Sequence, residues 1–220
     1  MCELLGMSAN VPTDICFNFT GLMERGGHTG PHRDGWGIAF YEDRGCRVFQ
    51  DPQPSADSEI ARLIHRYPIK SRTLRHCRPI GTTDSEHAFC YLLDAIRERF
   101  PRKPASPEAL TWLVTRLCTE LRQLGNFNIL LSDGRFLFAH CSTHLGYLTR
   151  RAPFGQARLL DAEVIVDFER ETTPNDIVTV IATRPLTSDE SWHVMPPDSI
   201  EIFIDGLPRH SPGADLERHA

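Results

Sequence analysis

The sequence lacks the features that mark membrane, secreted and metal-binding proteins. No apolar run within its 220 residues approaches the ~20 residues that span a bilayer, and no basic stretch followed by a sustained apolar segment opens the chain. The seven cysteines are odd in number and scattered, with no C-x-x-C pair and no tight cluster with histidine. We therefore predict a reduced, cytoplasmic protein that needs no membrane, no metal and no other cofactor.

An excess of basic residues is also missing. The chain has 24 Lys and Arg against 29 Asp and Glu, a formal net charge of -5, with both signs interleaved. A broad basic surface is what releases counterions from a nucleic-acid backbone, so nucleic acid is not an expected partner. Hydrophobic residues make up 40% of the chain, which is ordinary for a globular protein. Because no repeat and no Gly/Ser-rich linker divides the chain, we predict one domain over residues 1–220.

The residue pattern predicts two groups of strands with helices between them. Helices are expected from Asp14 to the glycines at 26–27, over 58–66, and after the N-caps Thr83 and Ser106. Strands are expected at 2–8, 36–41, 46–50, 69–74, 127–131, 136–140, 145–149, 163–168, 177–182 and 200–204. This order suits sheets packed face to face and covered by helices on the outside.

Cys2 can act as a self-contained nucleophile once the initiator Met1 is removed. Removal leaves a thiol and a free α-amine on one residue, and an α-amine titrates at about 7.7–8.0, so a useful fraction can accept the thiol proton at neutral pH. One residue then supplies both nucleophile and base. The plainer alternative is a small buried thiol at the start of a strand. His28, His32 and His140 could serve as a base instead, but nothing in the sequence brings them near Cys2, so they stay outside the predicted catalytic set.

Several ordered motifs resemble one family. They are Met-Cys-Glu-Leu-Leu-Gly-Met at the N-terminus, Arg25-Gly26-Gly27, the run from His32 to Tyr41, Thr83-Asp84-Ser85-Glu86, and the segments 130–134, 151–155 and 173–176. Together they resemble a class II glutamine amidotransferase of the stand-alone bacterial YafJ-type subgroup, within the N-terminal nucleophile (Ntn) hydrolases. The resemblance covers nearly the whole chain.

This resemblance implies an α+β fold, a four-layer αββα sandwich with two mainly antiparallel sheets. It also implies that Cys2 forms a γ-glutamyl thioester, releases ammonia and is freed by water. By its motif, Asp84 resembles the acid that binds the α-amino group of glutamine, while Gly35 and Trp36 resemble the wall beside the nucleophile. Each has a structural alternative, since an acid in the first turn of a helix is favoured by the helix dipole and Trp36 can serve as core alone.

The sequence departs from the family between Leu74 and Pro79. The resemblance implies a strand here with an arginine for the substrate carboxylate, and then an Asn-Gly pair whose amides form the oxyanion hole; neither is present. Losing one oxyanion donor typically costs about 10²- to 10³-fold in rate. Because the motifs on both sides are intact, we expect that a loop of the native protein is missing between about residues 74 and 79.

The leading interpretation is a glutaminase-like amidohydrolase, or an ammonia donor to a separate synthase. A close variant removes a γ-glutamyl group from a larger thiol or amine conjugate. From other classes, a non-catalytic binding protein that keeps the fold is favoured if the segment at 74–79 is truly short, and a thiol redox protein using Cys2 lacks an identifiable resolving cysteine. Arg25 and Arg33 could pair with a substrate carboxylate, but as single arginines beside glycines they are expected to face solvent.

Overall fold

The computed structural model describes residues 3–11, 13, 15–42, 45–51, 53–58, 84–102, 107–123, 125–168 and 173–209. The helix and strand predicted within 59–83, and the shortened segment at 74–79, lie outside these ranges. Among the described residues, no helix combines the length and the apolar character needed to cross a membrane.

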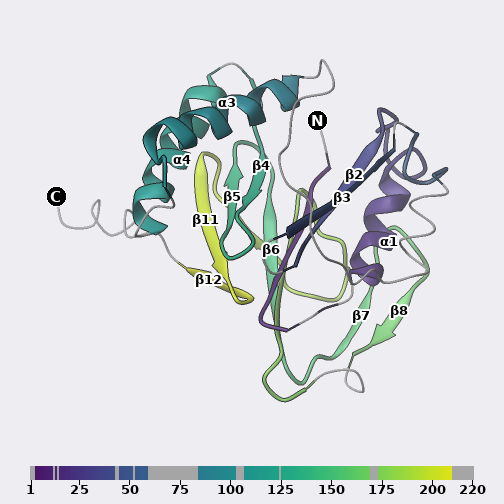
Figure 1. The fold of residues 1–220 in the computed structure, drawn as a ribbon. Helices are drawn as coiled ribbons and strands as arrows, with labels where there is room; N and C mark the ends of the chain where they lie inside the picture. The colour runs from purple at the N-terminus through teal and green to yellow at the C-terminus, as the bar shows by residue number, and fades with distance from the viewer. Residues whose placement is uncertain are drawn as a thin grey trace.

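Two antiparallel four-stranded sheets form the centre of the molecule (Figure 1). The first has the order β1-β9-β6-β10, with β1 at Leu5–Ala9, β9 at Ile177–Ala182, β6 at Gly146–Arg151 and β10 at His193–Val194. The second has the order β12-β11-β5-β4, with β12 at Leu207–Arg209, β11 at Ser199–Ile204, β5 at Leu137–Cys141 and β4 at Ile129–Ser132. The first sheet therefore joins the N-terminal strand to strands from the C-terminal third of the chain.

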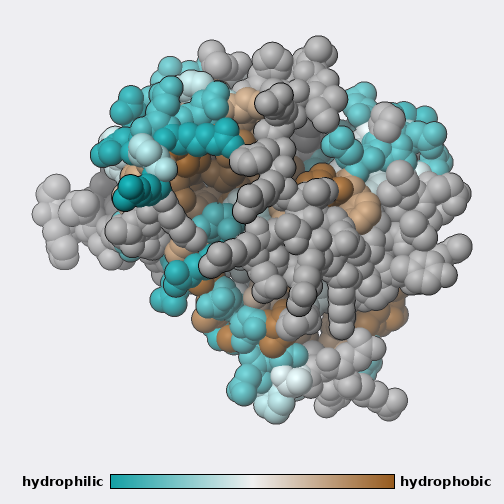
Figure 2. All heavy atoms as spheres, viewed as in Figure 1, coloured by the Kyte–Doolittle hydropathy of each residue, from teal (hydrophilic) through white to brown (hydrophobic). Residues whose placement is uncertain are grey.

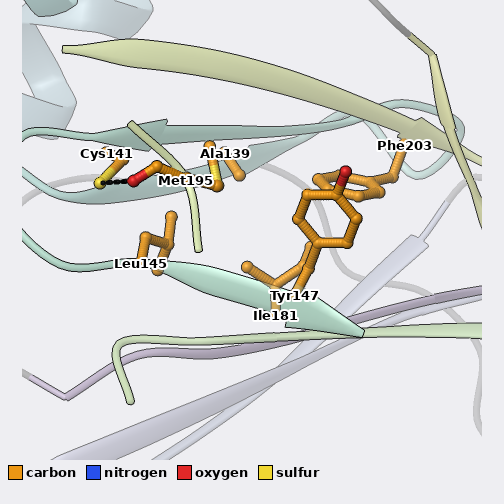
Figure 3. Close-up of a cluster of buried hydrophobic side chains, with 7 residues drawn as sticks. All are labelled: Ala139, Cys141, Leu145, Tyr147, Ile181, Met195 and Phe203. Carbon is orange, nitrogen blue, oxygen red and sulfur yellow. Dashed lines mark hydrogen bonds between the residues drawn. The ribbon is translucent and has the colours of Figure 1, made fainter. Parts of the chain in front are cut away.

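Alternating side chains along the strands build the core between the sheets. In β9, Ile181 faces the second sheet, whereas Val180 and Ala182 belong to the cluster on the opposite face. In Figure 3, Tyr147 and Ile181 from the first sheet lie opposite Phe203 from the second, with ring centroids of Tyr147 and Phe203 5.1 Å apart. The side chains of this layer are 8% exposed or less, so the two sheets share one continuous core.

Helices cover the outer face of each sheet, as the ribbon in Figure 1 shows. Helix α1 (Cys16–Arg25) lies on the β1 side, while α3 (Asp84–Arg99) and α4 (Pro107–Arg122) lie on the second sheet. The buried positions of α4 include Val114 and Cys118, which pack against the sheet residues Phe138 and Ile202. Figure 2 shows mainly hydrophilic side chains on the outer surface of this helix pair, as expected of helices with one apolar face. The predicted four-layer αββα arrangement is confirmed.

Two hairpins complete the fold on the α1 side. One pairs β2 (Trp36–Glu42) with β3 (Gly45–Asp51), and its apolar side chains pack with those of α1 around Phe19. The other pairs β7 (Gln156–Arg158) with β8 (Ile165–Asp167). The first hairpin confirms the prediction from the sequence, and it carries the Trp36 motif.

The start of α1 differs from the prediction. The residue before the helix is Ile15, which already has a helical conformation (φ -88°, ψ -11°) and makes no side-chain capping bond. Asp14, predicted as the cap, lies outside the described residues. The N-terminal strand also begins later than predicted, because its pairing with β9 starts at Leu5 rather than at residue 2.

His140 makes the stability of this fold depend on pH. Its ring is 2% exposed, and Nδ1 donates to the Phe127 carbonyl oxygen at 2.9 Å. Burial lowers the pKa of His140 below its usual 6.5, and the hydrogen bond to Phe127 only partly opposes this. The unfolded chain therefore takes up a proton below about pH 6.5 that the folded protein takes up only at lower pH, so stability falls as the pH drops through this range.

We expect His140→Asn to weaken this dependence, because the amide nitrogen can replace Nδ1 as donor without titrating. The measurement is Tm from pH 7.5 to 5.5 for both proteins. For one proton, the free energy of unfolding of the wild type should fall by at most about 1.4 kcal/mol per pH unit. Equal slopes of Tm against pH in the two proteins would show that His140 is not the group responsible.

Candidate active site

The end of β1 nearest the N-terminus is fixed to the residue that follows β9. The backbone N–H of Leu4 donates to Thr183 Oγ1 at 3.3 Å, and the Thr183 N–H donates to the Leu4 carbonyl oxygen at 3.2 Å. Cys2 itself lies outside the described ranges. The chain is thus held in place two residues after the predicted nucleophile.

Glu3 connects this strand end to a group of charged side chains. Its carboxylate accepts hydrogen bonds from the Thr183 hydroxyl and from the Arg184 guanidinium, and Arg25 Nη1 lies 3.6 Å from Oε2. His32 Nε2 lies 3.9 Å from Oε1. Burial raises the pKa of Glu3, but the bonds from Thr183 and Arg184 and the charges of the two arginines outweigh burial and hold the pKa below its ordinary value. Glu3 is therefore ionised at neutral pH.

Arg25 is the buried centre of this group, which corrects the prediction that it faces solvent. Its side chain is 4% exposed, and Nε donates to Asp161 Oδ2 at 2.7 Å. Two backbone carbonyl oxygens accept the remaining bonds, that of Arg184 at 3.1 Å and that of Pro185 at 2.5 Å. The guanidinium thus joins the end of α1 to three distant segments. Arg33, the other arginine in question, is exposed as predicted.

The glycine-rich loop after α1 is folded tightly onto the same group. Thr29 Oγ1 donates to Asp161 Oδ1 at 3.1 Å, so Asp161 holds both the helix end and the loop. A Cβ atom on Gly30 would lie 2.4 Å from the Arg25 carbonyl oxygen, which no larger residue could tolerate without a backbone shift. The loop therefore enters β2 along a defined path, past His32.

Gly35 and Trp36 follow at the start of β2. Gly35 has φ +98°, in the region that favours glycine. The Trp36 ring packs against Phe19 with centroids 5.7 Å apart, and Leu5 packs on the same phenylalanine. The indole Nε1–H is buried, yet it has no hydrogen-bond partner among the described residues. Trp36 is thus a partly buried member of the cluster around Phe19, and its buried indole N–H has no partner within the described part of the chain.

Comparison with known proteins decides the family. The model of the class-II glutamine amidotransferases matches the chain in two parts, residues 1–78 and 72–218. The chain belongs to the class II glutamine amidotransferase family. Its two matched parts overlap at 72–78, where the sequence departs from the family.

Individual relatives support the assignment. The chain is 49% identical to YafJ of Escherichia coli (strain K12), named as a candidate glutamine amidotransferase, over 251 residues covering 94% of this chain and 98% of YafJ. A similarly named protein of Haemophilus influenzae (strain ATCC 51907 / DSM 11121 / KW20 / Rd) is 37% identical over 94% of this chain and 85% of its own length. A crystal structure of a predicted glutamine amidotransferase from Pseudomonas aeruginosa PA01 has 44% identity and a TM-score of 0.69, covering 94% of this chain and 99% of that one.

Of the residues predicted for the site, the structure describes Gly35 and Trp36. Trp36 packs on Phe19 together with Leu5 of β1. Asp84 is the first residue of α3, and its side chain, like Cys2, lies outside the described part of the protein. The family name implies a glutamine-type substrate. In the described ranges, no group of three or more His, Cys, Asp and Glu side chains is arranged to hold a metal ion.

Two cysteines in the interior of the protein should be chemically inert. Cys118 and Cys141 are both fully buried, and burial raises the pKa of Cys118 to about 12 and that of Cys141 above its ordinary value. Because the thiolate is the reactive form, we expect neither to be alkylated by iodoacetamide at pH 8 in the folded protein. Peptide mapping before and after unfolding measures this. Rapid alkylation of Cys118 without unfolding would contradict the burial described above.

Proposed function

We propose that the protein hydrolyses the side-chain amide of glutamine, or of a γ-glutamyl compound, with Cys2 as nucleophile. The observation that carries the proposal is the family match, which begins at residue 1 and so includes Cys2. The thiol gives its proton to the α-amine of the same residue and attacks the amide carbon, forming a C–S bond. The C–N bond then breaks, and the proton leaves with ammonia or the amine. Water cleaves the γ-glutamyl thioester, releases the acid and restores the thiol.

We propose three residues for substrate binding. Asp84 binds the α-amino group of the substrate, and its place in the Thr83-Asp84-Ser85-Glu86 motif at the start of α3 supports this role. Gly35 lets the backbone approach the substrate, which its positive φ supports. Trp36 forms a wall of the pocket, and its unpartnered buried Nε1–H supports a role as hydrogen-bond donor there.

Ammonia or amine release from a small molecule is the whole proposed reaction, in the cytoplasm and without nucleic acid or membrane. The free thiols at Cys90, Cys118 and Cys141 support a reducing compartment. A separate synthase is the proposed acceptor where ammonia is the product. No cofactor takes part in this scheme, since the thiol and the α-amine supply both groups that the chemistry requires.

Glutamate release from defined amides tests the proposal. Met1-free protein should produce glutamate from L-glutamine or from a γ-glutamyl anilide, and a higher kcat/KM for the anilide would identify a conjugate as the preferred donor. L-asparagine, one methylene shorter, is the control and should be a poor substrate. If no γ-glutamyl amide yields glutamate while the protein is folded and its N-terminus is Cys2, the proposal is wrong.

A second proposal concerns the segment between Leu74 and Pro79, where we expect a missing loop that would contain the oxyanion donors. The family match in two parts that meet at 72–78 supports it, as does an alignment with YafJ of 251 residues, longer than the 220 of this chain. Intact-mass measurement of the native protein should give more than the mass of these residues. A mass equal to that of the printed sequence less Met1 would contradict the proposal.

The alternative function is a binding protein without catalysis. It is favoured by one observation, that no Asn-Gly dipeptide occurs anywhere in the chain. In that case glutamine should raise Tm in proportion to the logarithm of its concentration above Kd, with no glutamate formed. Turnover of glutamine would exclude this alternative.

A further inference from the structure

Glu3 is the residue directly after Cys2. It is held by its own side chain and by the backbone of the next residue, Leu4. The hydrogen bonds between Leu4 and Thr183 fix the backbone that follows it. One carboxylate oxygen accepts from the Thr183 hydroxyl and the other from the Arg184 guanidinium. Terminal residues are usually poorly ordered unless tied down, and here both oxygens of one side chain tie the terminus to the end of β9.

The charges around Glu3 make this attachment strong. The carboxylate is 13% exposed and lies 3.6 Å from the buried guanidinium of Arg25, which is itself fixed by Asp161. His32 approaches the same carboxylate from the glycine-rich loop, at 3.9 Å. Hydrogen bonds between ionised partners are shorter and about twice as strong as neutral ones. The pairing of β1 with β9 does not require these contacts, so they hold Glu3 in addition to the strand pairing.

The consequence concerns the geometry of the nucleophile. The backbone of Leu4 and the side chain of Glu3 are fixed, so the chain is held one residue after the proposed nucleophile. Attack on an amide carbon requires the reacting atoms at about 3–3.5 Å in the correct direction, and a displacement of about 1 Å can cost 10²-fold in rate. Fixing Glu3 should therefore matter most for the reaction of Cys2, the residue directly before it.

We propose that Glu3 is a positioning residue: its carboxylate, held by Thr183, Arg184 and Arg25, fixes the chain directly after Cys2 and thereby supports the reaction of the Cys2 thiol with the substrate. This inference rests on the proposed function, because it concerns the same nucleophile. It assigns Glu3 no contact with the substrate.

Glu3→Gln is the direct test, since glutamine keeps the side-chain length and the bond from Thr183 but loses the charge that holds two arginines. We expect kcat for glutamate release to fall about 10- to 100-fold, with KM changed by less than about 3-fold. The rate at which a diazoketone analogue of glutamine alkylates Cys2 should fall by the same factor. A purely structural role would lower Tm and leave kcat unchanged.

Glu190→Gln is the matched control. Glu190 is another buried acid, 17% exposed, and it accepts bonds from Arg150 Nε at 2.7 Å and Nη2 at 2.6 Å. Arg150 lies opposite Val178 in β9, five residues before Thr183, which is roughly 16 Å along a strand at about 3.3 Å per residue. The same chemical change away from the Glu3 network should lower Tm without lowering kcat.

Three results would overturn the role of Glu3: an unchanged kcat in Glu3→Gln, an equal loss of kcat in Glu190→Gln, or a rise in KM alone. If Glu3→Gln does not fold, Arg184→Gln replaces it, because Arg184 is 55% exposed and its side chain can be shortened at little cost to the fold. A wild-type kcat in Arg184→Gln would equally overturn the proposal. Wild-type protein that neither turns over nor reacts with the diazoketone would instead refute the proposed function, and the role of Glu3 with it.

Discussion

Cys2→Ala is expected to abolish glutamate release and alkylation by the diazoketone while leaving the fold intact. Loss of the nucleophile removes the covalent route, so kcat should fall by about 10⁴-fold or more. The strand pairing of β1 begins at Leu5, after the substituted residue, so Tm should change little. The measurement is glutamate release together with Tm for wild type and variant.

Cys90→Ala is the matched control for this substitution. Cys90 is a half-buried free thiol on α3, and the proposed mechanism gives it no part. We expect its kcat to equal that of wild type. A Cys2→Ala protein with more than a few per cent of wild-type activity would show that another group is the nucleophile, and a comparable loss in Cys90→Ala would show that the effect is not specific to the N-terminal thiol.

Arg25→Ala should produce the largest loss of stability. The substitution leaves the Asp161 carboxylate without its principal partner, removes a charge beside Glu3 and frees two carbonyl oxygens. Removing one partner of a buried ion pair costs about 3–5 kcal/mol, because the other charge stays buried and uncompensated. At about 2–4 °C per kcal/mol for a protein of this size, Tm should fall by roughly 10 °C.

Arg25→Lys separates charge from geometry. Lysine keeps the positive charge, but a compact ammonium cannot reach Asp161 and both carbonyl oxygens in the fixed directions of a guanidinium. We expect a Tm between those of wild type and Arg25→Ala. A Tm for Arg25→Ala within about 2 °C of wild type, less than 1 kcal/mol, would contradict the buried ion-pair network described here.

Local sequence signals predicted the secondary structure because they depend on near neighbours. A short, mostly apolar run gave β9 at its observed bounds, and the cap signals placed the starts of α3 and α4 within one residue. The strands β7, β10 and β12 were missed because two or three residues are too few to show a period. The pairing of β1 with β9 was equally invisible, since no local pattern indicates which distant strand lies alongside.

The candidate site was predictable only as a set of motifs. Resemblance gave Cys2, Asp84, Gly35 and Trp36, but the single-residue argument for Arg25 failed, because its partners lie in segments more than a hundred positions further along the chain. The Arg25-Gly26-Gly27 motif was the one available signal that Arg25 has a structural or functional role. A buried arginine becomes evident only when the sheet brings residue 184 and Asp161 to the end of α1.

The role of Cys2 as nucleophile is tested most directly by finding which residue reacts with the diazoketone analogue of glutamine. Protein should be incubated with the analogue, weighed intact and then mapped by peptide mass spectrometry. We expect one adduct per chain, on Cys2, in molecules that have lost Met1 and not in molecules that retain it, since a free α-amine must accept the thiol proton. No adduct on folded protein that begins at Cys2, or an adduct on any other cysteine, would contradict this role.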